Sequence, residues 1–251
     1  MLRIILSGCN GKMGRVITDI VTKKDDIDIV AGVDLDISQN GPYPVFKSFD
    51  DITVKADVII DFSNPAVLDD LLKYAKQKKL AAVIATTGFS DEQIRLIYSA
   101  GAEIPVFFSF NMSLGINLLA ELARKAASVL GGFDIEIIEK HHNQKIDAPS
   151  GTAILLANEI NDELKGKMTY EYDRHSKREK RTDTEIGIHA VRGGTIVGEH
   201  EVIFAGRDEI ITLSHSARSK EVFAVGAVNA AEFLSNKTSG VYSMKELVAE
   251  K

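Results

Sequence analysis

The segment from Ile138 to Thr152 carries the residues best suited to chemistry. It reads Ile-Glu-Lys-His-His-Asn-Gln-Lys-Ile-Asp-Ala-Pro-Ser-Gly-Thr, so the adjacent His141 and His142 are followed closely by Lys145. Histidine exchanges protons near neutral pH, and the lysine adds a positive charge. A single histidine is more often a packed or surface residue than a catalyst, but this clustering favours acid catalysis on a small carboxylate substrate.

The elements expected on either side would position these residues. Residues 133–138 alternate apolar and polar side chains and indicate a strand, whereas residues 153–160 have helical periodicity. The Ala148–Thr152 segment is typical of a helix start, with Ser150 or Thr152 as its cap. A helix start presents backbone N–H groups and the positive end of the helix dipole, so it suits an anion such as a carboxylate.

We expect no metal site in this segment. Adjacent histidines point to opposite faces if the strand continues through them. The only cysteine, Cys9, is far away in the sequence, and no ligand spacing of a zinc type is present.

The N-terminal segment has the layout of a nucleotide-binding unit. A short strand over 2–6 precedes Gly8-Cys-Asn-Gly11-Lys-Met-Gly14, and a helix over 15–24 and a strand over 27–33 follow, ending in Asp34. Such glycines let the backbone approach a pyrophosphate, and the acid can accept hydrogen bonds from a ribose. This glycine spacing is a weak signal alone, because a tight turn that binds nothing could share it. Together with its flanking elements it predicts dinucleotide binding.

The rest of the chain divides into two patterns. After an irregular connection over 35–50, strands expected at 57–61, 80–85 and 104–109 alternate with helices, which predicts a doubly wound parallel sheet. Its ligand crevice should lie at the carboxyl ends of the strands. A helix over 113–130 then precedes the histidine segment. Strands expected at 184–191, 195–204 and 209–215 follow, joined by turns so short that neighbours should be antiparallel. The sequence thus predicts an α/β fold: an N-terminal Rossmann-type doubly wound parallel sheet plus a central α+β domain with a broad mixed sheet.

Residues 165–183 are dense in charge. We interpret them as a solvated loop, with a mobile lid over an anionic substrate as the alternative.

Composition excludes several function classes. Of 251 residues, 45% are hydrophobic and 26% charged, and the net charge is −6, which argues against a general nucleic-acid partner. One cysteine allows no internal disulfide, as expected of a protein in a reducing compartment. The sequence shows neither a signal peptide nor a run of transmembrane length, so we expect a cytoplasmic protein with no membrane partner.

The histidine segment resembles a known signature. The pattern Glu139-x-His-His-x-x-Lys-x-Asp-Ala-Pro-Ser-Gly-Thr152 is similar to that of the 4-hydroxy-tetrahydrodipicolinate reductase family, long called dihydrodipicolinate reductase. The resemblance extends over nearly the whole chain, through residues 8–14, 61–65, 86–89, 111–115 and 185–200. The long signature is highly specific, whereas the glycine segment is not.

The resemblance implies a reductase of the diaminopimelate route to lysine that uses NADH or NADPH and yields tetrahydrodipicolinate. His141 would be the acid/base residue and Lys145 a second proton donor. The substrate, a small dicarboxylate, would be held by His142, Lys145, Ser150, Gly151 and Thr152. The dinucleotide would be held by Gly8, Cys9, Asn10, Gly11, Lys12, Met13, Asp34, Ala85, Thr86, Thr87, Ser109, Phe110, Asn111 and Met112.

It also implies a domain organisation and an assembly. Residues 1–112, rejoined by 219–251, would bind the dinucleotide. Residues 113–218 would bind the substrate and, through their sheet, assemble a homotetramer.

One departure from the family bears on cofactor choice. Some members place arginine directly after the acid of the second strand, where this chain has Leu35. Asp34 should repel a 2′-phosphate, while Lys12 or Arg15 could offset that repulsion. We therefore expect use of both cofactors, with NADH preferred by no more than about tenfold to a hundredfold.

Two rival function classes remain. One is an amino-acid dehydrogenase of the same two-domain plan, against which the His-His-x-x-Lys signature argues. The other is a non-catalytic redox sensor that binds NADH. A sensor would be expected to carry a DNA-reading helix and a basic face, and the sequence indicates neither.

Overall fold

The computed structural model describes residues 1–38 and 41–251, and in it the chain forms two compact units. Unit 1 comprises residues 1–114 and 221–251, and unit 2 comprises residues 115–220. Of the irregular connection predicted over 35–50, residues 39–40 lie outside the described part. None of the helices in the described ranges is long and apolar enough to cross a membrane.

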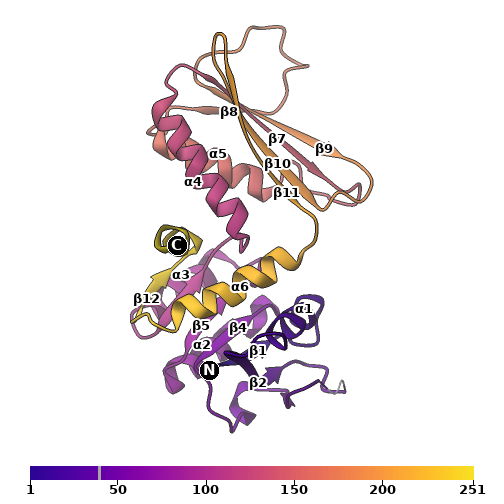
Figure 1. The fold of residues 1–251 in the computed structure, drawn as a ribbon, viewed down its shortest axis with the longest axis vertical. Helices are drawn as coiled ribbons and strands as arrows, with labels where there is room; N and C mark the ends of the chain where they lie inside the picture. The colour runs from indigo at the N-terminus through magenta and orange to yellow at the C-terminus, as the bar shows by residue number, and fades with distance from the viewer. Residues whose placement is uncertain (39–40) are drawn as a thin grey trace. The chain divides into compact units, whose positions relative to one another are not determined.

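Unit 1 is built on a seven-stranded sheet in which every pair of neighbours is parallel. The strand order is β12-β6-β5-β4-β1-β2-β3 (Figure 1). The strands are β1 (Leu2–Ser7), β2 (Ile27–Val33), β3 (Val45–Phe46), β4 (Val58–Asp61), β5 (Ala81–Ile84), β6 (Pro105–Phe108) and β12 (Gly240–Tyr242). The chain starts at β1, builds outward through β2 and β3, and then returns to build the other half. Ligands of such sheets bind where this reversal occurs, beside β1.

Helices cover both faces of this sheet because successive strand residues point to opposite sides. Ile4 and Leu6 belong to the core beneath one set of helices, and Ile5 belongs to the core beneath the other. The first set is α1 (Lys12–Val21), α6 (Glu221–Leu234) and α7 (Met244–Glu250). The second is α2 (Leu68–Lys78) and α3 (Asp91–Ala100), with short 3₁₀ turns η1 (Phe49–Asp51) and η2 (Pro65–Val67). The predicted doubly wound sheet is confirmed.

Helix α1 begins at Lys12, three residues before the predicted start, so Gly14 lies inside the helix. A Cβ atom at Gly14 would lie only 2.3 Å from the carbonyl oxygen of Gly8. The third glycine of the loop therefore allows the helix to pack on the loop that precedes it.

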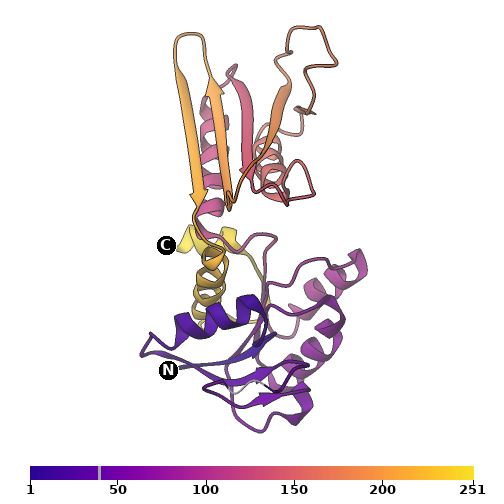
Figure 2. The same cartoon turned by 90° about the vertical axis from the view of Figure 1, so that its right-hand side faces the viewer.

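Unit 2 is a five-stranded mixed sheet with two helices on one face (Figures 1 and 2). The strand order is β11-β10-β7-β9-β8. The strands are β7 (Asp134–His141), β8 (Thr169–Glu171), β9 (Glu185–Arg192), β10 (Gly198–Ala205) and β11 (Ile210–Ala217). The helices are α4 (Leu114–Val129) and α5 (Gly151–Glu163). The predicted mixed sheet of the central region is confirmed.

One predicted pairing in unit 2 is wrong. Strands β10 and β11 are antiparallel neighbours as expected, but β9 and β10 do not pair, because β7 lies between them. Strand β7 is parallel to β9 and antiparallel to β10. The connection after Arg192 crosses the end of β7, where the Gly193 N–H donates to the His141 carbonyl at 2.9 Å. Five connecting residues are long enough to pass over one strand, so a short turn did not require direct pairing.

Candidate active site

Strand β7 delivers Glu139 and His141 to the face of the sheet that the helices cover. Its burial alternates, and Ile135 and Ile137 pack on α4 and α5 from the same face. Because the period of a strand is two, Glu139 and His141 follow them onto that face. Glu139 is 0% exposed and His141 is 9% exposed.

The Glu139 carboxylate is surrounded by four donors. Arg192 at the end of β9 donates from Nη1 at 2.8 Å and from Nη2 at 2.7 Å. The Nδ1 atom of His141 lies 2.6 Å away, and the Ser150 backbone N–H donates at 3.0 Å. Burial alone would raise the pKa of Glu139, but the hydrogen bonds from Arg192, His141 and Ser150 outweigh it and hold that pKa below its ordinary value.

An ionised Glu139 fixes which nitrogen of His141 can do chemistry. A carboxylate only accepts hydrogen bonds, so Nδ1 of His141 must carry the proton that it donates to Glu139. The other nitrogen, Nε2, is then the atom that can give or take a proton. It lies over Gly198 of β10, where an added Cβ would be 3.1 Å from Nε2.

The start of α5 is capped by Ser150, one of the two predicted caps. Its Oγ accepts from the Ala153 N–H at 3.2 Å and lies 3.0 Å from Nε2 of His200. Ser150 is only 2% exposed, and its own N–H is already committed to Glu139. Gly151, by contrast, is exposed at the first turn of the helix.

Lys145 lies in the loop between β7 and α5. Its Nζ donates to both carboxylate oxygens of Asp147, at 2.7 and 2.8 Å. The hydrogen bond from Lys145 holds the pKa of Asp147 below its ordinary range. Because the Asp147 side chain is largely exposed, this pair can exchange for a pair with a ligand carboxylate at little cost.

His200 of β10 adds a third imidazole to this end of the sheet. It faces Glu139 across the β7–β10 ladder, and its ring lies 5.2 Å from that of His141, edge to face. Burial, together with the nearby His141, lowers the pKa of His200 to about 4, so the ring is neutral at neutral pH.

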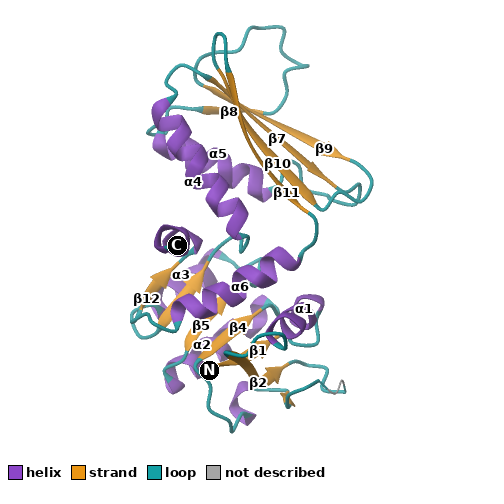
Figure 3. Ribbon diagram, viewed as in Figure 1, coloured by secondary structure: helices purple, strands orange, loops and turns teal. Residues whose placement is uncertain are grey.

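The charged loop predicted over 165–183 contains the short strand β8, and its Arg174 and Arg181 pair on the other face of the sheet. Figure 3 shows it as the long loop beyond β8. Arg174 donates to Glu136 at 3.3 Å and to Glu185 at 3.0 Å, and Arg181 pairs with Asp134. Glu136 points away from the face that carries His141, because it alternates with Glu139. These contacts favour the solvated loop over the lid.

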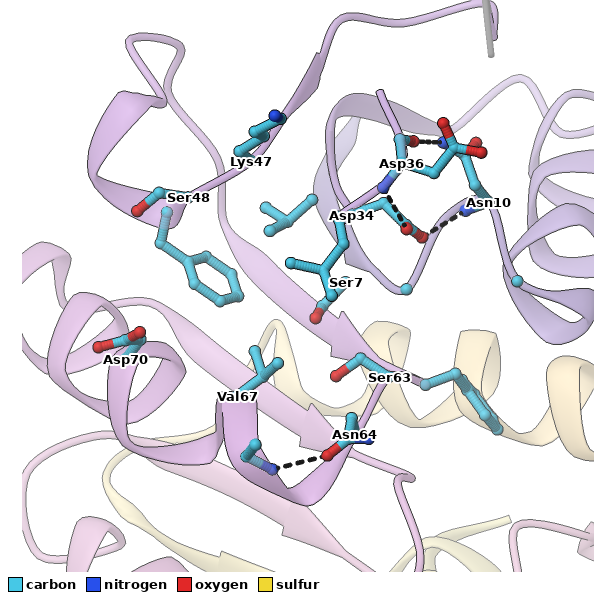
Figure 4. A pocket seen from close by; sticks show the side chains of 17 residues that line it. Ser7, Asn10, Asp34, Asp36, Lys47, Ser48, Ser63, Asn64, Val67 and Asp70 are labelled. Carbon is cyan, nitrogen blue, oxygen red and sulfur yellow. Dashed lines mark hydrogen bonds between the residues drawn. The ribbon is translucent and has the colours of Figure 1, made fainter. Parts of the chain in front are cut away.

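Unit 1 has a cavity of about 490 Å³ at the carboxyl ends of β1, β2 and β4 (Figure 4). Asp34 lies in it, and its carboxylate accepts from the Asn10 backbone N–H at 2.9 Å and from the Asp36 N–H at 3.1 Å. The lining residues are Ser7, Gly8, Asn10, Gly11, Val33, Asp34, Leu35, Asp36, Lys47, Ser48, Phe49, Phe62, Ser63, Asn64, Ala66, Val67 and Asp70.

These residues fit a dinucleotide. Gly8 has φ +76°, and a Cβ there would lie 2.3 Å from the Phe62 carbonyl oxygen, so only glycine allows the loop this close to β4. The loop leads directly into α1, whose N-terminus suits a pyrophosphate. Asp34 stands where the acid of such folds meets the ribose.

Only some of the predicted cofactor residues line this cavity. Gly8, Asn10, Gly11 and Asp34 line the cavity. Within the described ranges the lining does not include the others: Cys9, Lys12, Met13, Ala85, Thr86, Thr87, Ser109, Phe110, Asn111 and Met112. The last seven of these follow β5 and β6.

Two of these residues have structural partners of their own. The Thr86 hydroxyl donates to Asp61 at 2.6 Å and accepts from the Ser63 N–H at 2.8 Å, so it joins the ends of β4 and β5. Cys9 is buried, and burial with the nearby Asp34 raises the pKa of its thiol to about 11. Its role there is packing.

Three residues of these sites carry no predicted role: Arg192, His200 and Lys47. The first two fall in the segment 185–200 that resembles the family, but on different strands. Only the insertion of β7 between β9 and β10 brings both to Glu139. No group of three or more metal-binding side chains occurs in the described part of the chain.

Comparisons with known proteins identify the family of the chain. The family description "Dihydrodipicolinate reductase, N-terminus" matches residues 2–112, and "Dihydrodipicolinate reductase, C-terminus" matches residues 115–248. The 4-hydroxy-tetrahydrodipicolinate reductase of Caldanaerobacter subterraneus subsp. tengcongensis is 52% identical over 99% of this chain and 98% of its own length. That of Clostridium tetani is 52% identical over 97% of this chain and 96% of its own.

A solved structure gives the same result. The dipicolinate-bound dihydrodipicolinate reductase of Paenisporosarcina sp. TG-14 superposes with a TM-score of 0.82 at 27% identity, covering 97% of each chain. With both family descriptions matched along nearly its full length, the chain belongs to the dihydrodipicolinate reductase family.

Proposed function

We propose that this chain reduces 4-hydroxy-tetrahydrodipicolinate to tetrahydrodipicolinate with NADH or NADPH, in the diaminopimelate route of lysine biosynthesis. The observation that supports this proposal is that Glu139, His141 and Ser150 come together at one end of the unit 2 sheet. There the Glu139 carboxylate forms hydrogen bonds with His141 and with the Ser150 N–H at the start of α5. The chain is also 52% identical to a 4-hydroxy-tetrahydrodipicolinate reductase. The reaction consumes one hydride and one proton and releases one water molecule.

Substrate binding falls to the loop after β7. Lys145 and the first turn of α5, at Gly151 and Thr152, offer positive charge and backbone N–H groups to the two carboxylates. His142, which follows β7 directly, adds a further donor. The exposed carboxylate of Asp147 gives up Lys145 when a substrate carboxylate takes its place.

Proton delivery falls to His141, with Lys145 as a second donor. Glu139, which Arg192 anchors, holds the ring through Nδ1, so a proton carried on Nε2 is the one available to the substrate. Loss of the substrate's 4-hydroxyl group as water would leave a conjugated C=C–C=N system, to which a bound dinucleotide would supply the hydride. The enamine that results must gain a proton, and a donor fixed in place lowers the barrier to that step.

The units divide the work in this proposal. Residues 1–112 and 219–251 bind the dinucleotide, through the glycine loop, Asp34 and the segments after β5 and β6. Residues 113–218 bind the substrate. The test is oxidation of NADH by the purified protein with the condensation product of pyruvate and aspartate semialdehyde. No loss of NADH absorbance above an enzyme-free control would contradict the proposal.

The proposed assembly is a homotetramer formed through the sheet of unit 2. The face of the sheet opposite α4 and α5 carries four apolar residues: Ile138, Val191, Ile203 and Ile210. Strand alternation and the register of neighbouring strands place them there, on the face opposite to that of Glu139 and His141. Val191 is 45% exposed and Ile210 is 68% exposed, as suits a surface that another copy covers. Light scattering at micromolar concentration should give four times the chain mass, and a monomer would contradict this assembly. We place the protein in the cytoplasm, with the rest of an amino-acid pathway.

A further inference from the structure

We propose that His200 is a positioning residue that holds the Ser150 hydroxyl ready to donate a hydrogen bond to a substrate carboxylate. This inference rests on the proposed function, because it concerns how the same site recognises its substrate.

His200 lies in a row of residues across the sheet. Its register partners are Glu139 on β7 and His215 on β11, so all three share the face that α4 and α5 cover. His200 is 4% exposed, and its Nε2 atom lies 3.0 Å from the Ser150 Oγ. Its Nδ1 atom is also buried and has no hydrogen-bond partner among the described residues.

The unpartnered nitrogen identifies the tautomer. A neutral imidazole has one N–H group and one bare nitrogen. If the proton were on Nδ1, a buried N–H would have no acceptor; if it is on Nε2, that N–H is satisfied by Ser150 and only a lone pair is left over. Buried donors without acceptors are rarer than under-used acceptors. Nε2 therefore carries the proton and donates to Ser150.

Ser150 then has both of its lone pairs in use. Its Oγ accepts from His200 Nε2 and from the Ala153 N–H, which leaves its own proton to be donated elsewhere. Glu139, whose carboxylate already accepts from the Ser150 backbone N–H, cannot take it. That group has about four acceptor positions, and Arg192, His141 and the Ser150 N–H together supply four donors. The hydroxyl proton is left for a ligand at the start of α5.

A buried histidine could instead serve packing alone, and a double-mutant cycle separates the two roles. The variants are His200→Phe, which removes the donor at similar volume, Ser150→Ala, and the pair together. His200→Gln is the conservative control, because its side-chain amide keeps an N–H near the position of Nε2. Dissociation constants for dipicolinate and for NADH would be measured by calorimetry, and thermal unfolding would be followed for each variant.

We expect His200→Phe and Ser150→Ala each to weaken dipicolinate about tenfold, the scale of one hydrogen bond to a charged group. The double variant should be no weaker than Ser150→Ala, and His200→Gln should stay within about threefold of the wild type. NADH affinity should not change, and KM for the substrate should rise more than kcat falls. Additive losses, or unchanged dipicolinate affinity in His200→Phe, would overturn the inference.

A second measurement needs only the folded wild type. Nitrogen NMR of protein labelled at histidine should show His200 protonated at Nε2 and bare at Nδ1 near neutral pH, with its signals assigned by their absence in His200→Gln. The opposite tautomer would overturn the inference whatever the variants do. If the wild type binds dipicolinate but does not oxidise NADH with the proposed substrate, the proposed reaction is contradicted. The same spectra would still show whether His200 donates to Ser150.

Discussion

At the scale of single residues, Glu139 determines how its neighbours can act. It is fully buried, yet it stays ionised because Arg192, His141 and the Ser150 N–H all donate to it. Each of those three groups is thereby held in one orientation. Removing such a buried anion would leave the paired Arg192 without its partner and cost far more than one surface contact.

The catalytic assignment makes a direct prediction. His141→Gln and Lys145→Ala should each lower kcat by roughly a hundredfold or more, the usual scale for a lost general acid. NADH affinity should barely change, because neither side chain belongs to the cavity of unit 1. Steady-state kinetics and NADH titrations check both statements.

Matched controls lie in the charged loop. His175 and Lys180 are exposed, so His175→Gln and Lys180→Ala should behave as the wild type. Near-normal kcat in both site variants would sink the assignment of His141 and Lys145.

Cofactor choice depends on charges around one cavity. Asp34, Asp36 and Asp70 line it, and Lys47 is the one cation among its described lining residues. We expect both cofactors to be used, with NADH preferred by no more than about tenfold to a hundredfold in kcat/KM, or about 1.4–2.8 kcal/mol. Lys47→Ala should reduce kcat/KM for NADPH more than for NADH, and Asp34→Ala should do the reverse.

Lys12→Ala provides the comparison for Lys47→Ala. The sequence predicts a 2′-phosphate contact for Lys12 or Arg15, but the cavity lining in the described ranges does not include Lys12. Its substitution should therefore change the NADPH-to-NADH ratio less. A clear wild-type preference for NADPH would show that the acidic residues do not control the choice.

At the scale of elements, β10 places a glycine directly beside the ring of His141. A Cβ at Gly198 would lie 3.1 Å from His141 Nε2, closer than an ordinary contact allows, so the ring must move by a few tenths of an ångström. Gly198→Ala should lower kcat about tenfold, because general acids act only over short, well-aligned distances. Thermal stability should change little, since the imidazole can tilt.

Gly131→Ala is the control for that substitution. A Cβ at Gly131 meets no atom within 4 Å, so this variant should keep wild-type kcat. Equal kcat in the two alanine variants would show that the position of the His141 ring is not critical.

The elements also show what the sequence could predict and what it could not. The parallel sheet was predictable because several of its strands, such as β4 and β5, carry short apolar runs that precede a helix start. The strand order of unit 2 was not, since a short connection can either join neighbours or pass over one strand. The roles of Arg192 and His200 depend on that order, so residue types alone could not assign them. Strands β3, β8 and β12, of two or three residues, are too short to show a period.

At the scale of the whole molecule, the buried His200 links stability to pH. Its pKa is about 4 in the folded protein and 6.5 ordinarily, so the unfolded chain binds the extra proton first as the pH falls. The contribution of His200 to the free energy of unfolding is fully present above about pH 6.5 and is lost as the pH falls to about 4. The groups that face it are His141, Glu139, His215 and Lys145.

The free energy of unfolding should fall by about 3 kcal/mol between pH 6.5 and pH 4. Urea unfolding at several pH values should show it in the wild type, and His200→Gln should be markedly less sensitive over the same range. Parallel curves for the two proteins would contradict a neutral, buried His200.

Unit 1 is assembled from two separate parts of the chain, and this has a consequence for synthesis on the ribosome. One face of its sheet is covered in part by Ala227, Val228 and Leu234 of α6, which are made only after all of unit 2. At elongation rates of about 5–20 residues per second, roughly a hundred intervening residues delay that cover by about 5–20 s. During that time residues 1–114 expose the apolar sheet face that α6 later covers. Unit 2 is continuous in sequence and can fold as it emerges. This is the interval in which a chaperone would find its binding site.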